Sequence, residues 1–409
     1  MTTQTAKAES LSSTNIPAHR IASIDIFRGL TMLVMIFVND LASVHGLPWW
    51  TYHAHAEQDA MTYVDMVFPF FLFIVGMSLP LAVRQRLKRN PSLPLLFWHM
   101  WSRSAGLVVL GLILANAEKG DASRMAINPN AWALLGLSGA VLFWHVPSRN
   151  PRKARISLGL RVAGLALLIV TFAMFRRTTQ DGNATWIDGS YPEILGLIGY
   201  TYLAVAILYI STRRWAWAPL GWTAGLLTLC TVLSRQQVQL RLPIYMWPIG
   251  SGALASIVMA GVVTSILFFG EHRWQSLPQR MFLAAGFAGT SLLAAWLLTP
   301  LGISKIRATP TWCLYSIGAS VLWFAVLYWI CDVRHKTEWA EFVHSSGANT
   351  LLTYLLPDFY YFITALAGFT FVDRHFSSGA TGVARAAIFT LLMLALSSGL
   401  TRARLRLQL

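Results

Sequence analysis

The chain has 409 residues, of which 55% are hydrophobic and only 12% are charged. Ordinary soluble domains carry about 25% charged residues, so the composition excludes a soluble protein and indicates a chain whose main solvent is lipid. The net charge of +15 would suggest a nucleic-acid partner in a soluble protein. In a membrane protein the basic residues chiefly set topology, and we expect no nucleic-acid partner.

Runs of about 20 apolar residues, the length that crosses a bilayer, recur along the whole chain. Continuous runs such as MVFPFFLFIVGM are typical of helices, whereas a β-barrel would show short alternating segments. The predicted fold is an all-α polytopic transmembrane helical bundle of about 11 to 12 spans. The candidate spans are residues 24–43, 61–83, 96–116, 131–147, 156–175, 194–212, 216–234, 250–270, 281–300, 312–331, 349–372 and 383–401.

Lys and Arg are distributed unevenly between the two sides of this predicted bundle. The side that holds both termini collects more than twice as many of them as the other side. Because cytoplasmic loops carry an excess of basic residues, we expect both termini to be cytosolic. Residues 1–20 are then a cytosolic tail, and residues 21–409 form a single membrane domain, since no connection is long enough for a soluble domain.

The first candidate span carries polar residues near both ends. Asp25 and Arg28 lie three residues apart and are expected to be neighbours on one helix face. Asn39 and Asp40 follow about 11 residues later, roughly 16 Å along a helix. Ionisable groups within a span cost roughly 2.5 to 3.5 kcal/mol to insert, so they are functional candidates by default. For Asp25 and Arg28, a structural ion pair at the interface is an equal alternative.

The loop after the first span, HGLPWWTYHAHAEQD, contains three histidines and no Lys or Arg, and the charge pattern predicts that it is periplasmic. Asp65 follows just inside the second span, where a carboxylate needs a partner. We predict that His55, ten residues earlier, is this partner, because a carboxylate fixes the tautomer of an imidazole suited to proton transfer near neutral pH. His53 is interpreted as an ordinary solvated loop residue.

Further polar residues lie in or near later spans. Arg103 lies about eight residues into the third span, roughly 12 Å deep, and is expected to face the interior and meet an anion. Lys305 and Thr309, in GISKIRATPTW, belong to a loop that enters the tenth span from the periplasmic side.

The eleventh candidate span contains a second polar group of residues. Asn349, Tyr354 and Asp358 are spaced so that they share a broad helix face, with Pro357 expected to break the hydrogen-bond ladder nearby. The chain contains no HExxH, GxxxxGK[ST] or GxSxG motif. We therefore expect no metal site and no nucleotide hydrolysis.

The segments SIDIFRGLTMLVMIFVND and HAEQDAMTYVDMVFPFFLFIVGMS resemble the heparan-α-glucosaminide N-acetyltransferase family and its bacterial relatives, part of a wider transmembrane acyltransferase superfamily. The shared pattern is an S-x-D-x-x-R-G start, an Asn late in that helix, and a histidine ten residues before D-x-V-F-P. These positions are Asp25, Arg28, Asn39, His55 and Asp65. Weaker likeness continues through YPEILGLIGYTYLAVAIL, GISKIRATPTW and SSGANTLLTYLLPD.

The resemblance implies an enzyme of the bacterial inner membrane that takes acetyl-CoA from the cytosol and acetylates an amino sugar on the periplasmic side. It also implies a homodimer, and a branch linked to N-acetylglucosamine utilisation. Two departures leave the donor contacts and the acceptor open. The family's Q-R pair reads Gly196 and Leu197, and its W-N-G after the histidine reads Gln58, Asp59 and Ala60.

Two hypotheses are open. In an acetyltransferase, His55 is the general base or a transient acetyl carrier, Asp65 orients it, and Asn39 donates to the developing oxyanion. In a secondary transporter of amino sugars such as N-acetylglucosamine, Asp25, Asp65 and Asp358 would form a proton relay. The residues expected to bind acetyl-CoA are Arg28, Asp25, Arg103, Asn349 and Tyr354. Those expected to bind the acceptor are Asp40, Lys305, Thr309 and Asp358.

Overall fold

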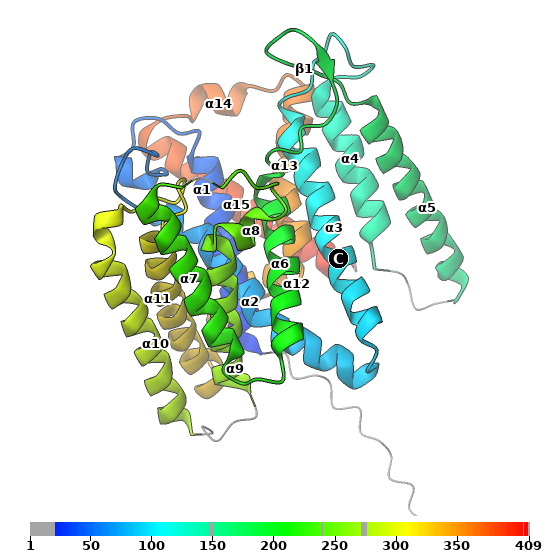
Figure 1. Cartoon of the computed structure of the whole chain (residues 1–409). Coiled ribbons are helices and arrows are strands. Elements are labelled where there is room, and N and C mark those ends of the chain that lie inside the picture. Colours follow the sequence, from blue (N-terminus) through cyan, green and yellow to red (C-terminus); the bar gives the residue numbers. More distant parts are fainter. Residues whose placement is uncertain (1–20, 147–150, 239, 271–275, 404, 408–409) are drawn as a thin grey trace, which may run out of the picture.

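The computed structural model describes residues 21–146, 151–238, 240–270, 276–403 and 405–407, so the predicted tail 1–20 lies outside the described residues. The described chain is a helical bundle with one short antiparallel hairpin (Figure 1). The longer helices are α1 (Ala22–Leu41), α2 (Val64–Arg89), α3 (Leu93–Ala117), α4 (Pro129–Trp144), α5 (Pro151–Met174), α6 (Glu193–Thr212), α7 (Ala218–Gln236), α9 (Ala253–Phe269), α10 (Leu277–Leu297), α11 (Pro310–Tyr328), α13 (Thr350–Leu366) and α15 (Gly379–Arg402). The short elements are η1 (Trp49–Thr51), β1 (Arg177–Thr178), β2 (Ala184–Thr185), α8 (Trp247–Gly250), η2 (Thr299–Leu301), the π-helical turn η3 (Trp329–Val333), η4 (Glu338–Ala340), α12 (Glu341–Ala348) and α14 (Phe371–His375).

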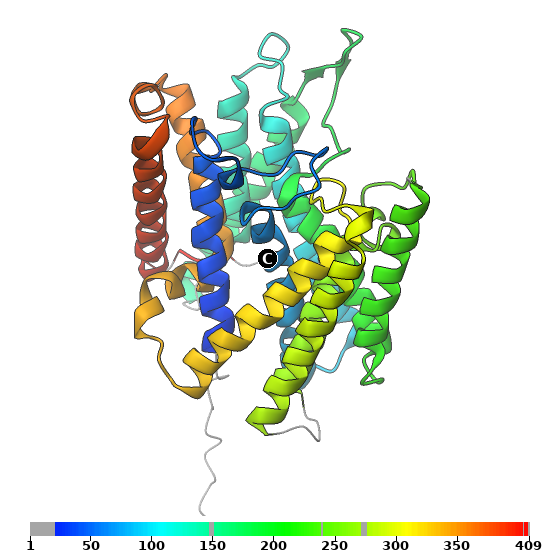
Figure 2. The same cartoon turned by 90° about the vertical axis from the view of Figure 1, so that its left-hand side faces the viewer.

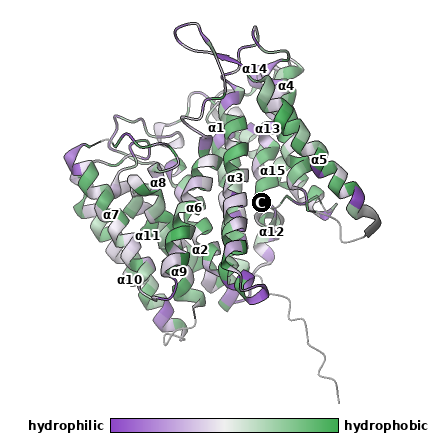
Figure 3. Cartoon of the chain, turned by 45° about the vertical axis from the view of Figure 1, so that its right-hand side comes forward, coloured by the Kyte–Doolittle hydropathy of each residue, from purple (hydrophilic) through white to green (hydrophobic). Residues whose placement is uncertain are grey.

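Each candidate span predicted from the sequence overlaps one of the longer helices. Eight helices of the described chain are long and apolar enough to cross a membrane. Hydrophobic residues follow the helices, and hydrophilic ones gather at helix ends and in loops (Figure 3). The prediction of an all-α polytopic membrane protein is confirmed, whereas the total of 11 to 12 spans and the side of each terminus stay predictions.

Glycines let α2 and α9 pack with their backbones almost in contact. A Cβ atom on Gly76 of α2 would lie 1.8 Å from the carbonyl oxygen of Val258 in α9. On the facing helix, a Cβ on Gly261 would lie 2.1 Å from the carbonyl oxygen of Phe73. Small residues allow such approach where lipid supplies no hydrophobic drive between helices. This crossing fixes α2, which carries the key carboxylate of the candidate site.

The first helix is anchored at its N-terminal end by distant residues. The two carboxylate oxygens of Asp332, in η3, accept hydrogen bonds from the amides of Ala22 and Ser23, each at 3.1 Å. These amides have no partner within the helix, so the carboxylate caps α1 and interacts favourably with its dipole. The beginning of α1 is thereby tied to the end of α11.

Prolines do not interrupt the helices in which they occur. Helix α2 continues through Pro69 and Pro80, and α13 continues through Pro357. Pro357 has no N–H to donate, so the hydrogen-bond ladder lacks one bond there as predicted, but the helix itself is not interrupted. Neighbouring helices in a membrane bundle tolerate proline because local adjustments satisfy the freed carbonyl groups.

The two ends of the bundle differ in composition. One end, here called the histidine-loop end, holds residues 42–63, the β1–β2 hairpin and residues 298–309, and it lies at the top of Figures 1 and 2. The other, here called the basic end, holds the C-terminus of α2, the turn 213–217 between α6 and α7, and the C-terminus of α9. The N-terminus of α1 also lies at the basic end (Figure 2).

Candidate active site

Residues 42–63 fold back on themselves and bring their two ends together at the start of α2. The hydroxyl of Tyr52 donates to the carbonyl of Val44 at 2.5 Å, and the hydroxyl of Thr62 donates to the carbonyl of Tyr52 at 2.8 Å. These hydrogen bonds close the loop without any regular secondary structure beyond η1. Consequently His53 is delivered to the N-terminus of α2.

Asp65 is the centre of this arrangement. Its side chain is 1% exposed and lies in the first turn of α2. One oxygen, Oδ2, accepts from the amides of Ala54 and Thr62 at 3.2 and 3.0 Å and from the Thr62 hydroxyl at 3.3 Å. The other, Oδ1, lies 2.7 Å from Nδ1 of His53. Helix N-termini favour carboxylates, so both the dipole and four hydrogen bonds hold this anion in place.

The structure corrects the predicted partner of Asp65. His53, interpreted from the sequence as a solvated loop residue, makes the contact that we predicted for His55. The exposed His55 instead has its backbone amide bonded to Oε1 of Gln58 at 3.1 Å. The physical reason is the wrapping of residues 53 and 54 around the carboxylate, because the Ala54 amide and the His53 ring bind the two different oxygens. Spacing along the chain does not reveal this turn.

An imidazole held in this way has a defined tautomer. In the neutral imidazole, a carboxylate at 2.7 Å accepts a hydrogen bond from Nδ1–H, which leaves the lone pair on Nε2 of His53. The His53 side chain is 44% exposed, and the nitrogen of the Lys305 side chain lies 3.4 Å from Nε2. The pair therefore has the geometry of a general base with an orienting acid.

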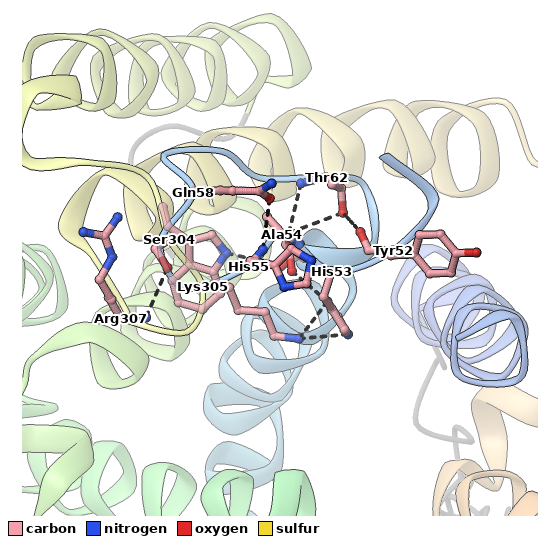
Figure 4. A network of polar contacts seen from close by, with 11 residues as sticks. Tyr52, His53, Ala54, His55, Gln58, Thr62, Ser304, Lys305 and Arg307 are labelled. Atoms are coloured by element: carbon pink, nitrogen blue, oxygen red, sulfur yellow. Dashed lines mark hydrogen bonds and ion pairs between the residues drawn. The ribbon is translucent and has the colours of Figure 1, made fainter. Parts of the chain in front are cut away.

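Lys305, in the segment 298–309, lies beside the pair of His53 and Asp65. Its ammonium nitrogen lies 3.4 Å from each ring nitrogen of His53 (Figure 4). Burial lowers the pKa of Lys305 below its ordinary value, against the opposing attraction of Asp65 and Glu193. The prediction that Lys305 belongs to the site thus agrees with its position.

Thr309, predicted to bind the acceptor, has a structural role in the same loop. Its hydroxyl oxygen caps α11 by accepting from the amide of Trp312 at 3.5 Å, and it also accepts from the amide of Ser304 at 3.0 Å. The indole of Trp312 then donates to the carbonyl of Asp65 at 3.2 Å. Thr309 is buried and serves to lock the start of α11 against the start of α2.

Glu193 is a site residue that sequence reasoning missed. It begins α6 with a φ of 57°, a left-handed conformation that costs a residue other than glycine roughly 1 to 2 kcal/mol. Its Oε2 accepts from the hydroxyl of Tyr354 at 3.4 Å, and it lies within electrostatic range of Lys305 and Asp358. Strain of this kind persists only where the surroundings impose it. In the sequence, the only indication of this residue was an acidic residue at the start of a span, in the motif YPEILG.

A cavity of about 140 Å³ lies between α1 and α13. Its polar lining is Asn39, Tyr354, Asp358 and Tyr361, and methionine, isoleucine and proline side chains form the rest. Asn39, Tyr354 and Asp358, which we assigned to catalysis, donor binding and acceptor binding, therefore line the same cavity. The cavity is smaller than typical ligand pockets of about 300 to 1,000 Å³, and it suits a small group such as an acetyl.

Asp40 is engaged elsewhere. Its Oδ2 lies 3.2 Å from Nε of Arg385, and its Oδ1 accepts from the hydroxyl of Tyr361 at 2.9 Å. Both ion-pair partners are nearly buried, at 10% and 8% side-chain exposure. This ion pair joins α1 to α15, and the predicted contact of Asp40 with the acceptor stays a prediction.

At the basic end, the predicted pair of Asp25 and Arg28 forms, with 3.1 Å between Oδ1 and Nη1. Arg28 also donates to the carbonyl of Gly347 at 3.2 Å and to the hydroxyl of Ser78 at 2.8 Å. These contacts join α1, α2 and α12. Asp25 and Arg28 therefore form the ion pair that was predicted as the structural alternative. Their role in binding acetyl-CoA stays a prediction.

Two other residues expected to bind acetyl-CoA contact the chain itself. The side chain of Asn349 donates to the Thr401 hydroxyl and the Leu405 carbonyl, each at 2.9 Å, so it fixes the C-terminal segment. The guanidinium of Arg103 lies over the ring of Tyr202, 5.0 Å from its centroid. An aromatic face, which attracts cations, occupies the position where we expected an anion.

The departures from the family pattern have structural explanations. Asp59 pairs with Arg307, which ties the histidine loop to residues 298–309, while Gln58 receives the His55 amide. A Cβ on Gly111 of α3 would lie 2.6 Å from the amide of Gly196, so the two helices meet closely at the position of the family's glutamine.

Comparison with known proteins confirms the resemblance. The chain is 32% identical to human (Homo sapiens) heparan-α-glucosaminide N-acetyltransferase over 122 residues and 34% identical to the mouse (Mus musculus) protein over 125 residues. Each match covers 30% of this chain and 17% of the relative, so the chain spans only a small part of these proteins. A family model described as “Domain of unknown function (DUF5009)” matches residues 20–254, more than half of the chain. The chain is therefore a member of the DUF5009 family.

Proposed function

We propose that this chain is a membrane-embedded acetyltransferase of the bacterial inner membrane, which moves an acetyl group from cytosolic acetyl-CoA to an amino sugar on the periplasmic side. The observation that carries the proposal is the buried Asp65 carboxylate holding an accessible imidazole at the histidine-loop end. The partial likeness to two N-acetyltransferases supports the same reaction class.

In this proposal His53 is the general base. As the acceptor nitrogen attacks the thioester carbonyl, Nε2 of His53 takes the proton of the amine, and Asp65 stabilises the imidazolium. The carbonyl oxygen becomes an oxyanion, for which the Lys305 ammonium and the Asn39 amide are candidate donors. When the carbon–sulfur bond breaks, the CoA thiolate leaves and receives the proton from His53, so amide and thiol are the products.

The structure reduces the number of candidate residues for binding the acceptor and the acetyl-CoA donor. Asp358 lines the cavity beside Asn39 and is our candidate for accepting a hydrogen bond from the acceptor amine, whereas Asp40 and Thr309 serve the fold. Asp25 and Arg28 stay as candidates for the donor because they lie at the end from which acetyl-CoA would enter. The homodimer implied by the resemblance remains a prediction.

The transporter hypothesis has weaker support. Two members of its proposed proton relay are already held, Asp25 by Arg28 and Asp65 by four hydrogen bonds. A relay needs groups that exchange protons readily, and a carboxylate stabilised as an anion does so poorly. Sugar uptake by liposomes without acetyl-CoA, retained in His53→Ala, would favour transport.

The test measures release of free CoA by the purified chain supplied with acetyl-CoA and glucosamine. His53→Ala and His55→Ala are compared in parallel, and each serves as the matched control for the other. Loss of activity in His53→Ala alone supports our assignment. Loss in His55→Ala alone would return the catalytic role to the residue predicted by the motif. Full activity in both variants would rule out imidazole catalysis.

A further inference from the structure

A cavity of about 460 Å³ lies at the basic end, on the far side of the bundle from the candidate active site. Helices α2, α6, α7 and α9 and the turn 213–217 form its walls. Arg84, Arg213 and Arg214 line it, together with the aromatic side chains of Tyr209 and Trp215. The proposed acetyl transfer uses none of these residues.

The described side chains that line this cavity carry charge of one sign. Among the described residues that line it, none is acidic. Arg213 and Arg214 have exposed side chains, and the intramolecular contact of Arg213 is a long one, 3.5 Å to the carbonyl of Ile210. Arg84 is placed beside them by a hydrogen bond of 3.4 Å to the carbonyl of Phe269. The guanidinium groups of Arg213 and Arg214 are adjacent in the chain and repel one another, so a bound anion would stabilise them.

The depth of the cavity indicates where such an anion would come from. Arg84 follows Asp65 by 19 positions in α2, about 28 Å along the helix, which is close to the roughly 30 Å thickness of the hydrocarbon core. With Asp65 at one membrane interface, Arg84 would lie at the opposite one, near the level of lipid phosphates. The exposed Trp215 lies at the same level, as expected of tryptophan.

The remaining walls are apolar. Leu81 and Leu87 of α2 and Ile266 and Phe269 of α9 continue the cavity beside the arginines. A second cavity of about 530 Å³ lies on the other side of the same turn and shares Arg213 and Arg214, with Leu93 and Phe97 opposite them. A ligand with both phosphate and hydrocarbon would use all of these surfaces, whereas a soluble phosphate compound would use only the arginines.

We propose that this cavity binds the headgroup of an anionic phospholipid, with its phosphate on Arg213 and Arg214 and its acyl chains along the apolar walls. Basic pockets between transmembrane helices are known to hold such headgroups. The site is independent of the acetyltransferase proposal, because it shares no residue with it.

The test measures binding of phosphatidylglycerol to the full chain in phosphatidylcholine nanodiscs. The variant Arg213→Gln/Arg214→Gln is compared with Arg86→Gln/Arg89→Gln, which removes equal charge from exposed residues of the same end that do not line the cavity. At about five-fold in affinity for each arginine that hydrogen-bonds the phosphate, we expect about a 25-fold loss in the first variant. The control pair makes no such contact, and its loss should be less than about two-fold.

Three results would overturn the proposal. Equal losses in both variants would show that the lipid responds only to surface charge. Displacement of the lipid by equimolar CoA or inorganic phosphate would show that the cavity holds a soluble phosphate. Unchanged binding in the first variant would show that the arginines do not contact lipid. If the double variant fails to fold in phosphatidylcholine alone, Arg214→Gln replaces it, with an expected loss of about five-fold.

Discussion

The two ends of the bundle manage charge in opposite ways. At the histidine-loop end each of the acids Asp65, Asp40 and Glu193 has a defined hydrogen-bond or ion-pair partner. At the basic end, the cavity between α2, α6 and α9 gathers arginines, with no acid among the described residues that line it. Paired charge holds a carboxylate in one position, whereas neighbouring charges of one sign favour the binding of an anion. The comparison predicts that mutations at the first end alter chemistry and stability, and those at the second alter binding.

The strongest test of the first end is the coupling between Asp65 and His53. We expect Asp65→Asn and His53→Ala each to lower kcat for CoA release by about 10² to 10⁴, the usual contribution of a positioned base. The effects of residues that act as one unit are not additive, so the double variant should be no slower than the slower of the two single variants. Steady-state kinetics of the parent, the two single variants and the double variant measures kcat. Additive losses of kcat would show that Asp65 and His53 act independently.

The next test removes one member of the buried ion pair. Arg385→Met leaves Asp40 without its cation in a site where both side chains are nearly buried. Breaking such a pair costs about 3 to 5 kcal/mol, which we expect as a lower free energy of unfolding in detergent. The control is Lys119→Met, whose pair with Asp188 is partly exposed and should be worth about 0 to 1 kcal/mol. Equal losses would contradict the structural role of Arg385.

The fold could be predicted from the sequence because lipid imposes a simple rule. A span needs a long apolar run, and each predicted run overlaps a helix. The pair of Asp25 and Arg28 was also predictable, since residues three apart on a helix are neighbours.

The site was less predictable because it depends on contacts between distant segments. Asp65 was recognised as an acid that needs a partner, but the irregular loop decides which histidine reaches it. The pairing of Asp40 with Arg385 joins residues 345 positions apart, and nothing local indicates it. The strained start of α6 at Glu193 is likewise imposed by packing and invisible in composition.

A third test separates charge from backbone strain at Glu193. Glu193→Gln keeps the left-handed backbone and removes the charge, whereas Glu193→Gly removes both the charge and the strain. We expect both variants to raise KM for the amino sugar about ten-fold, the equivalent of about 1.4 kcal/mol. Only Glu193→Gly should gain stability, by about 1 kcal/mol. Unfolding in denaturant and initial-rate kinetics measure the two effects, and unchanged KM in both variants would remove Glu193 from the site.

The smallest expected effect is the pH dependence contributed by Lys305. Burial places its pKa in the folded protein below that in the unfolded chain, so the folded state binds this proton less well. The cation therefore costs stability at every pH below the folded pKa, and the cost disappears as the pH rises through that value toward the unfolded pKa. We expect Lys305→Met to unfold at a higher temperature than the parent at neutral pH, with the difference shrinking in alkaline buffer. Lys88→Met, at an exposed position of the basic end, is the control and should show no such trend. A difference that grows with pH would mean that the attraction of Asp65 and Glu193 outweighs burial, and Lys305 would then stabilise the histidine-loop end as a cation.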